Sequence, residues 1–295
     1  MKIIITGASG FLGRHLVQYF SKEDLVTIGR TEGTVIAHLE NDIPVLPKAD
    51  LVIHNAGKAH LNPTTQAEVL DFYTVNVTGT KNLLSALSES NAIPAAFVFI
   101  SSIAVYGKET GYLIPEDAPL DASDPYGKSK VEAEFLVQEW CLLRQVPYAI
   151  LRLPLIAGTN APGNLKAMIR GIKKGYYFNI GGGLARKSMV LASSVPEAIL
   201  PSVAAGGIYN LTDGYHPSFA ELSEQIALQL NKKMPGSIPN WVAKSMSFVG
   251  TLLGKKAPIN KKSYKKMIND LTFDDAKARR AFGWSPLKVV GNFKI

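Results

Sequence analysis

Residues 2–13 read Lys-Ile-Ile-Ile-Thr-Gly-Ala-Ser-Gly-Phe-Leu-Gly, and this stretch decides the fold. An apolar run of strand length, Ile3–Ile5, leads into a turn with glycines at Gly7, Gly10 and Gly13, and a helical pattern follows directly. Gly7 allows a tight turn, Gly10 lets the backbone approach a pyrophosphate, and Gly13 lets the helix pack closely. Because a helix N-terminus offers unpaired N–H groups to an anion, the stretch predicts a dinucleotide-binding site.

Bulk composition fits a large α/β protein. The chain has 295 residues, enough for one large domain with a smaller appendage. Its single cysteine, Cys141, excludes an intrachain disulfide and a cysteine metal cluster, which suits a reducing cytoplasm. The first strand begins at residue 2 and no apolar stretch reaches the roughly 20 residues of a membrane span, so we expect a cytoplasmic protein without a signal peptide.

The net charge of +8 is concentrated in a late lysine run. We interpret this run as a solvated surface rather than a site for an anionic partner, and we expect no nucleic-acid partner. Its members are Lys255, Lys256, Lys261, Lys262, Lys265 and Lys266.

Strand and helix patterns alternate about six times in the first half of the chain, which predicts a doubly wound parallel sheet of the Rossmann type. We assign residues 1–157 to this dinucleotide-binding domain, with 187–211 returning to it as strands at 187–191 and 207–211 around a helix from Val195. Residues 158–186 and 212–295 form a smaller, interleaved C-terminal lobe for substrate. The helical patterns expected in this lobe include 164–174, 218–230, 239–253 and 261–282.

The end of the second strand bears on cofactor choice. An acidic residue there would bind the ribose 2′-hydroxyl of NAD, but the sequence places Gly29-Arg30. Gly29 leaves room, and the Arg30 guanidinium can pair with a 2′-phosphate. The sequence therefore favours NADP(H), with NAD as the alternative.

Two later segments place polar side chains at the same edge of the sheet. The strand at 95–100 ends in Ser101-Ser102, whose hydroxyls we expect to point into the crevice. Asp124-Pro125 is typical of a helix start, and it places Tyr126 and Lys130 one turn apart on one face.

With Thr6-Gly7-x-x-Gly10-x-x-Gly13, His54-Asn55-Ala56-Gly57, Ser102 and Tyr126-x-x-x-Lys130 in order, the sequence resembles the extended short-chain dehydrogenase/reductases. It is most similar to their nucleotide-sugar epimerase, dehydratase and reductase branch, whose closing motif resembles residues 282–286. The resemblance implies a nucleotide-sugar substrate, a homodimer, and a catalytic triad of Ser102, Tyr126 and Lys130. A tyrosine base needs a nearby positive charge, which we expect Lys130 to supply by lowering the pKa of Tyr126.

The resemblance also implies cofactor and substrate contacts. Substrate contacts are expected at Ser102, Tyr126, Asn164 and Lys187. Cofactor contacts are expected at Gly7, Gly10, Phe11, Leu12, Gly13, Arg30, Asp42, Ile43, Ala56, Gly57, Lys58, Asn76, Ser101, Tyr126, Lys130 and Leu153.

The reaction is predicted as hydride transfer at C4 of a nucleotide-linked hexose, with a role in sugar-nucleotide and polysaccharide biosynthesis. Gly29-Arg30 favours an NADPH-dependent 4-keto-sugar reductase, and the alternative is a UDP-glucose-type 4-epimerase with tightly bound NAD. The family's asparagine after the sixth strand is replaced by Leu155, and its usual acid in the returning segment by Ser193-Ser194. A 4,6-dehydratase is disfavoured because Ser101–Ala104 carries no carboxylate.

Two alternatives from other classes stay open. One is a non-catalytic NADP(H)-binding sensor. The other is an enzyme acting on lipid-linked sugar at a membrane surface, through an interfacial helix ahead of the lysine run; we interpret that stripe instead as packing in the core or lobe. Its members are Trp241, Val242, Met246, Phe248, Val249, Leu252 and Leu253. The histidines show no metal-ligand spacing.

Overall fold

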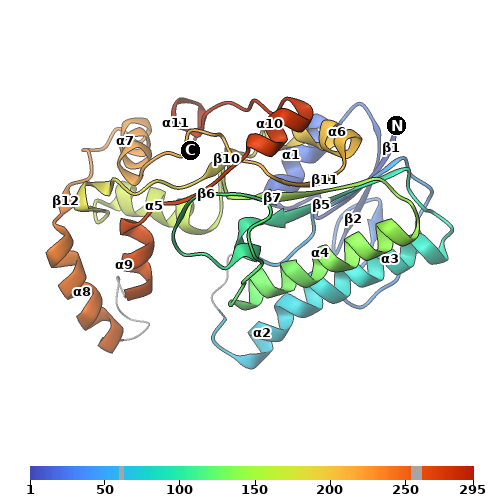
Figure 1. Cartoon of the computed structure of the whole chain (residues 1–295), viewed down its shortest axis with the longest axis horizontal. Coiled ribbons are helices and arrows are strands. Elements are labelled where there is room, and N and C mark those ends of the chain that lie inside the picture. The colour runs from blue at the N-terminus through green and yellow to red at the C-terminus, as the bar shows by residue number, and fades with distance from the viewer. Residues whose placement is uncertain (60–62, 254–260) are drawn as a thin grey trace.

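Seven parallel strands form the central sheet of the computed structural model, which describes residues 1–59, 63–253 and 261–295 (Figure 1). The strands lie in the order β11-β7-β5-β4-β1-β2-β3. Their bounds are β1 (Lys2–Thr6), β2 (Asp24–Gly29), β3 (Val35–Ile36), β4 (Leu51–His54), β5 (Ala96–Ser102), β7 (Tyr148–Leu153) and β11 (Gly207–Asn210).

Alternate residues of the strands face two helical layers. Ile3 and Ile5 belong to a buried cluster with α1 (Phe11–Tyr19) and α6 (Val195–Ala205). Ile4 belongs to a second cluster with α3 (Gly79–Glu89) and α4 (Pro125–Leu143) on the opposite face. Both faces of the sheet are therefore covered, which explains why its strands are apolar throughout and confirms the predicted doubly wound α/β fold.

The strand order reverses between β1 and β4, which lie side by side at the middle of the sheet. In open parallel sheets, a ligand binds at the carboxyl ends of the strands where this reversal occurs. The glycine turn after β1 and the loop after β4 meet there.

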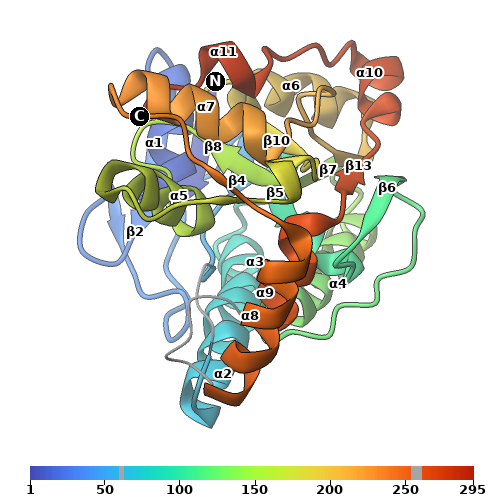
Figure 2. The same ribbon diagram turned by 90° about the vertical axis from the view of Figure 1, so that its left-hand side faces the viewer.

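The other elements are short or belong to the predicted lobe (Figure 2). Leu165, Met168, Leu222, Ile226 and Phe293 of the predicted lobe share an apolar cluster with Ala157, Met189 and Leu191. The elements are α2 (Gln66–Tyr73), a π-helical turn (Thr74–Thr78), a 3₁₀ turn (Ile103–Tyr106), β6 (Gly111–Ile114), β8 (Leu155–Ala157), α5 (Gly163–Lys174), β9 (Asn179–Ile180), a 3₁₀ turn (Gly181–Gly183), β10 (Met189–Leu191), α7 (Phe219–Gln229), β12 (Ser237–Ile238), α8 (Asn240–Leu253), α9 (Lys261–Ile268), β13 (Leu271–Phe273), α10 (Ala276–Phe282) and α11 (Val289–Asn292).

Two expectations about the C-terminal part are corrected. The strand expected at 187–191 does not join the central sheet, because β10 pairs with β8 in a separate two-stranded sheet, whereas β11 does join the central sheet beside β7. The helix expected over 261–282 is broken by β13, which pairs with β6. Both corrections arise from strand partners that are remote in sequence.

Some expectations fall outside the described residues: Lys255, Lys256 and His60, together with the side chains of Val249, Leu252, Leu253 and Lys262. In the ranges that the structure describes, no helix is both long and apolar enough to cross a bilayer. The same ranges contain no group of three or more His, Cys, Asp or Glu side chains arranged to hold a metal ion. The division into domain and lobe stays a prediction.

Candidate active site

The glycine turn after β1 is held in a form that only glycine allows. Gly7 has φ +66°, and a Cβ there would lie 2.8 Å from the backbone nitrogen of Ala56. A Cβ at Gly13 would lie 2.0 Å from the carbonyl oxygen of Gly7, so α1 packs directly on the turn. Gly10, the N-cap residue, has no side chain that can accept from the first turn of α1. The N–H groups of that turn are thus available to an anion.

Buried polar side chains fix the loop after β4 against this turn. The Thr6 hydroxyl oxygen accepts from the backbone N–H groups of Asn55 (3.1 Å) and Ala56 (2.9 Å). The His54 ring lies between the hydroxyls of Thr6 (2.7 Å) and Thr80 (2.8 Å). Burial, with a smaller effect of the Lys130 charge, lowers the pKa of His54 to about 3. This histidine is neutral and structural.

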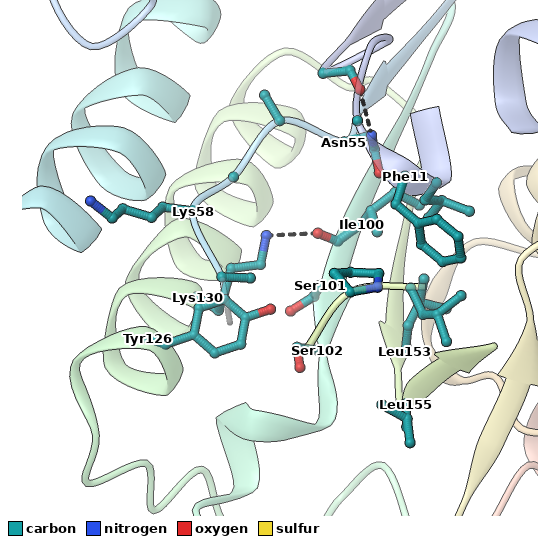
Figure 3. Close-up of a pocket in the computed structure, with 18 of the residues that line it drawn as sticks. Phe11, Asn55, Lys58, Ile100, Ser101, Ser102, Tyr126, Lys130, Leu153 and Leu155 are labelled. Carbon is teal, nitrogen blue, oxygen red and sulfur yellow. Dashed lines mark hydrogen bonds between the residues drawn. The ribbon is translucent and has the colours of Figure 1, made fainter. Parts of the chain in front are cut away.

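A pocket of about 430 Å³ extends from the glycine turn to the start of α4 (Figure 3). Twelve of the residues predicted from the sequence line it: Gly7, Gly10, Phe11, Leu12, Ala56, Gly57, Lys58, Ser101, Ser102, Tyr126, Lys130 and Leu153. No Asp or Glu is among the residues that line this pocket. One end is therefore suited to phosphate and the other carries hydroxyl and ammonium groups.

The start of α4 is set by its cap and by one close contact. The Asp124 carboxylate accepts from the N–H of Gly127 at 3.1 Å, and Pro125 occupies the first turn. A Cβ at Gly127 would lie 2.6 Å from the carbonyl oxygen of Ala104, so glycine lets α4 approach the 3₁₀ turn after β5. This contact brings Tyr126 beside the end of the strand that carries Ser102.

A π-helical turn between α2 and α3 places Asn76 behind the pocket wall. Its side-chain oxygen accepts from the N–H of Lys58 (2.7 Å), and its amide donates to the carbonyl of Lys58 (3.1 Å) and to the Ser129 hydroxyl (2.9 Å). Ser129 in turn donates to the carbonyl of Tyr126 at 2.8 Å. Asn76, predicted as a cofactor contact, connects the β4 loop to α4, and its contact with a cofactor stays a prediction.

The three residues of the predicted triad lie together. The Tyr126 hydroxyl and the Lys130 ammonium point into the same pocket, near Ser102 (Figure 3). The Lys130 ammonium donates to the carbonyl of Ile100 at 2.7 Å and lies 4.1 Å from the centroid of the Phe99 ring. Burial lowers the pKa of Lys130 to about 8, although the Glu134 carboxylate acts in the opposite direction.

The pKa of Tyr126 corrects the sequence prediction. Burial raises this pKa above its usual value, and a hydrogen bond with Ser102 only partly offsets the increase. We expected Lys130 to lower it, but that ammonium is directed at the Ile100 carbonyl. Tyr126 is therefore a neutral phenol, the protonation state of a proton donor.

Ser101 lines the pocket and its hydroxyl is bonded to a buried carboxylate. Its hydroxyl donates to Glu134, a side chain that is fully buried. The same carboxylate forms an ion pair with Arg152 at 2.7 Å. We expected both serine hydroxyls to point into the crevice; Ser102 forms a hydrogen bond with Tyr126, whereas the Ser101 hydroxyl donates to Glu134. The buried Glu134–Arg152 pair was not predicted.

The other predicted contacts lie outside the pocket. The Arg30 guanidinium is half exposed and pairs with Glu40 at 3.0 Å. The Asp42 carboxylate accepts from the N–H of His38 at 2.6 Å, and Ile43 is exposed. Asn164 is exposed near the start of α5, and Lys187 donates to the carbonyl of Asn269 at 2.8 Å.

Gly29 also has a structural role. A Cβ there would lie 2.1 Å from the carbonyl oxygen of Glu32, so the chain's own turn requires glycine at this position.

Sequence reasoning missed seven residues that line the pocket: Asn55, Ala59, Ile100, Pro154, Leu155, Ile156 and Pro162. Asn55 stands in the quoted motif after β4, and its amide donates to the carbonyl of Gly7 at 3.1 Å. The apolar members give no polar signal in the sequence. Four of them, Pro154, Leu155, Ile156 and Pro162, come from the segment between β7 and α5.

Comparisons with known proteins agree with this geometry. The family model described as "NAD dependent epimerase/dehydratase family" matches residues 3–211. A UDP-glucose 4-epimerase of Vibrio cholerae is 28% identical over 312 residues, covering 96% of this chain and 90% of the relative. An N-acetyl-alpha-D-glucosaminyl-diphospho-ditrans,octacis-undecaprenol 4-epimerase of Escherichia coli O157:H7 is 28% identical over 298 residues, covering 93% and 88%.

A reductase is also among the relatives. GDP-6-deoxy-D-mannose reductase of Pseudomonas aeruginosa is 27% identical over 244 residues, covering 77% of this chain and 79% of the relative. The solved structure of RMD from Pseudomonas aeruginosa complexed with NADPH has a TM-score of 0.71 at 22% identity, covering 97% of this chain and 93% of that one. MoeE5 in complex with UDP-glucose and NAD has a TM-score of 0.74 at 19% identity, with the same coverage. These structures share the fold.

Proposed function

Because this chain belongs to the NAD dependent epimerase/dehydratase family of the extended short-chain dehydrogenase/reductases, we propose that it transfers hydride at C4 of a nucleotide-linked hexose, as an NADPH-dependent 4-keto-sugar reductase. The observation that carries the proposal is the convergence of Ser102, Tyr126 and Lys130 on one pocket whose other end is the glycine turn. Three polar groups suited to proton transfer thus face the region that a dinucleotide on that turn would reach.

The residues present fit a dinucleotide. Gly7, Gly10, Phe11 and Leu12 would hold its pyrophosphate, since the turn excludes a Cβ at Gly7 and the cap leaves N–H groups free. Ala56, Gly57 and Lys130 line the pocket toward the position proposed for the nicotinamide ribose. The chemistry that the cofactor supplies when bound is hydride transfer.

The chain's own residues would then complete the reduction. The neutral Tyr126 phenol donates its proton to the carbonyl oxygen at C4, and the Ser102 hydroxyl donates a hydrogen bond to the same oxygen. The Lys130 ammonium, which has three donors and uses one on Ile100, stabilises the tyrosinate that is left. Because burial keeps the Tyr126 phenol neutral, the side chain is in the protonation state of a donor.

Two observations bear on competing reactions. Dehydration needs a carboxylate near the reacting carbons, and none lines the pocket. A 4-epimerase is the second candidate, because the Vibrio cholerae and Escherichia coli relatives are named as 4-epimerases.

The cofactor content of the purified protein distinguishes the two candidates. An epimerase must keep its cofactor bound between two half-reactions, whereas a reductase need not, so for a reductase we expect much less than one equivalent of NAD(H) per chain. Chromatography of the denatured protein's supernatant measures this, and one retained NAD per chain would support the epimerase instead.

Cofactor preference is tested at Arg30. We expect Arg30→Ala to raise KM for NADPH about 10- to 100-fold while KM for NADH changes little, since a charge-assisted hydrogen bond to the 2′-phosphate is lost. Glu40→Gln is the matched variant: it removes the carboxylate that pairs with Arg30, so KM for NADPH should fall. Steady-state kinetics with both cofactors measures this. An equal effect of Arg30→Ala on NADPH and NADH would contradict the proposed preference.

A further inference from the structure

Helix α8 exposes large apolar side chains that the sequence analysis assigned to the core or lobe. Trp241 is 73% exposed, Phe248 59% and Met246 41%, so that interpretation is wrong for these residues. The small residues Ala243 and Ser247 on the same helix are buried. Helix α8 therefore buries its small side chains and presents its aromatic ones to solvent.

Basic side chains surround this apolar stripe. Exposed Lys244 lies between Trp241 and Phe248 in sequence, and the Lys261 ammonium of α9 lies 5.3 Å from the centroid of the Phe248 ring. Lys265 and Lys266 of α9 are also exposed. The sequences of α8 and α9 contain five lysines and no acidic residue. We call Trp241, Phe248, Lys244, Lys261 and Lys265 the α8–α9 face.

We propose that the α8–α9 face docks on an anionic membrane surface. Tryptophan and phenylalanine bind at the boundary between headgroups and acyl chains, while lysines pair with anionic headgroups and bury their stems in apolar surroundings. The two helices project from the lobe, away from the central sheet (Figures 1 and 2).

The positive charge of the α8–α9 face favours an anionic membrane over a second copy of the chain. A two-fold interface would bring the α8–α9 face against itself, and lysines without acidic neighbours would then repel one another. A nucleic acid would also pair with the lysines and could stack on Trp241 and Phe248, so RNA binding is measured as the competing outcome. An anionic bilayer complements both the charge and the apolar stripe.

The experiment is flotation of the full-length protein with phosphatidylcholine vesicles, with and without phosphatidylserine. We expect the protein to float with the anionic vesicles only, and the bound fraction to fall as salt rises. The Trp241→Ser/Phe248→Ser double variant should bind about tenfold less. Leu143→Ser, which changes an equally exposed leucine at the end of α4, is the matched control and should bind normally.

Tryptophan emission gives a second readout, since Trp140 and Trp284 are buried and Trp241 is exposed. Anionic vesicles should shift the emission to shorter wavelength, and Trp241→Phe should abolish that shift.

Failure to float with anionic vesicles would overturn the proposal. So would a monomer–dimer change in the double variant without loss of flotation, or equal binding to RNA and vesicles. Reductase activity is measured separately on soluble substrate, so neither result depends on the other.

Discussion

Replacing Tyr126 by phenylalanine is expected to lower kcat for sugar reduction by about 10²- to 10⁴-fold, because the proton donor is lost. The ring should stay in place, since its contact with Phe72 (centroids 6.1 Å apart) does not involve the hydroxyl. KM for NADPH should therefore change little. Steady-state kinetics with a 4-keto sugar nucleotide, and a fluorescence titration of NADPH binding, measure the two effects.

Tyr112→Phe is the matched control for this prediction. Tyr112 lies in β6 and is 73% exposed, so removal of its hydroxyl should leave kcat unchanged. If Tyr126→Phe retained full activity with normal cofactor binding, the phenol would not be the proton donor. If Tyr126→Phe instead abolished activity in vitro but left all cellular function unchanged, the non-catalytic sensor predicted as an alternative would account better for the site.

Replacing Arg152 by methionine is expected to reduce the free energy of unfolding by about 3–5 kcal/mol, because the buried Glu134 carboxylate loses its ion pair. Arg152 is 2% exposed and also donates to the Tyr106 hydroxyl and the Glu116 carbonyl, both at 2.9 Å. Its removal leaves these acceptors unpaired as well. Urea unfolding measured by circular dichroism gives the change.

Two control variants test whether the unpaired Glu134 carboxylate causes this loss of stability. Arg152→Met/Glu134→Leu removes both buried charges, so it should recover most of the lost stability. Lys108→Met breaks the exposed pair with Asp121 (2.9 Å), and should cost less than about 1 kcal/mol. Equal losses for Arg152→Met and Lys108→Met would show that burial of the Glu134–Arg152 pair is unimportant.

Local signals made much of the fold and site predictable from the sequence. The three glycines after β1 and the Asp124-Pro125 start of α4 act through neighbouring residues, so their spacing is visible in the sequence. The capping box at Ser218 and Glu221, which begins α7, is of the same kind. From these signals we predicted the glycine turn and the placement of Tyr126 and Lys130 on one face of α4.

What could not be predicted depends on distant partners. The pairing of β13 with β6 brings together segments about 160 residues apart, and no local pattern indicates it. The sequence predicted that the Ser101 hydroxyl points into the crevice. In the structure this hydroxyl donates to Glu134, 33 residues later in the chain. The exposure of Trp241 likewise depends on which side of α8 packs, and an apolar stripe of helical spacing does not decide this.

The most direct test of hydride transfer at C4 follows deuterium from NADPH labelled at C4 of the nicotinamide into a UDP- or dTDP-4-keto hexose. We predict that the product sugar carries deuterium at C4 and that one NADP⁺ forms for each sugar reduced. Conversion of the sugar nucleotide without deuterium in the product would contradict the proposed reduction.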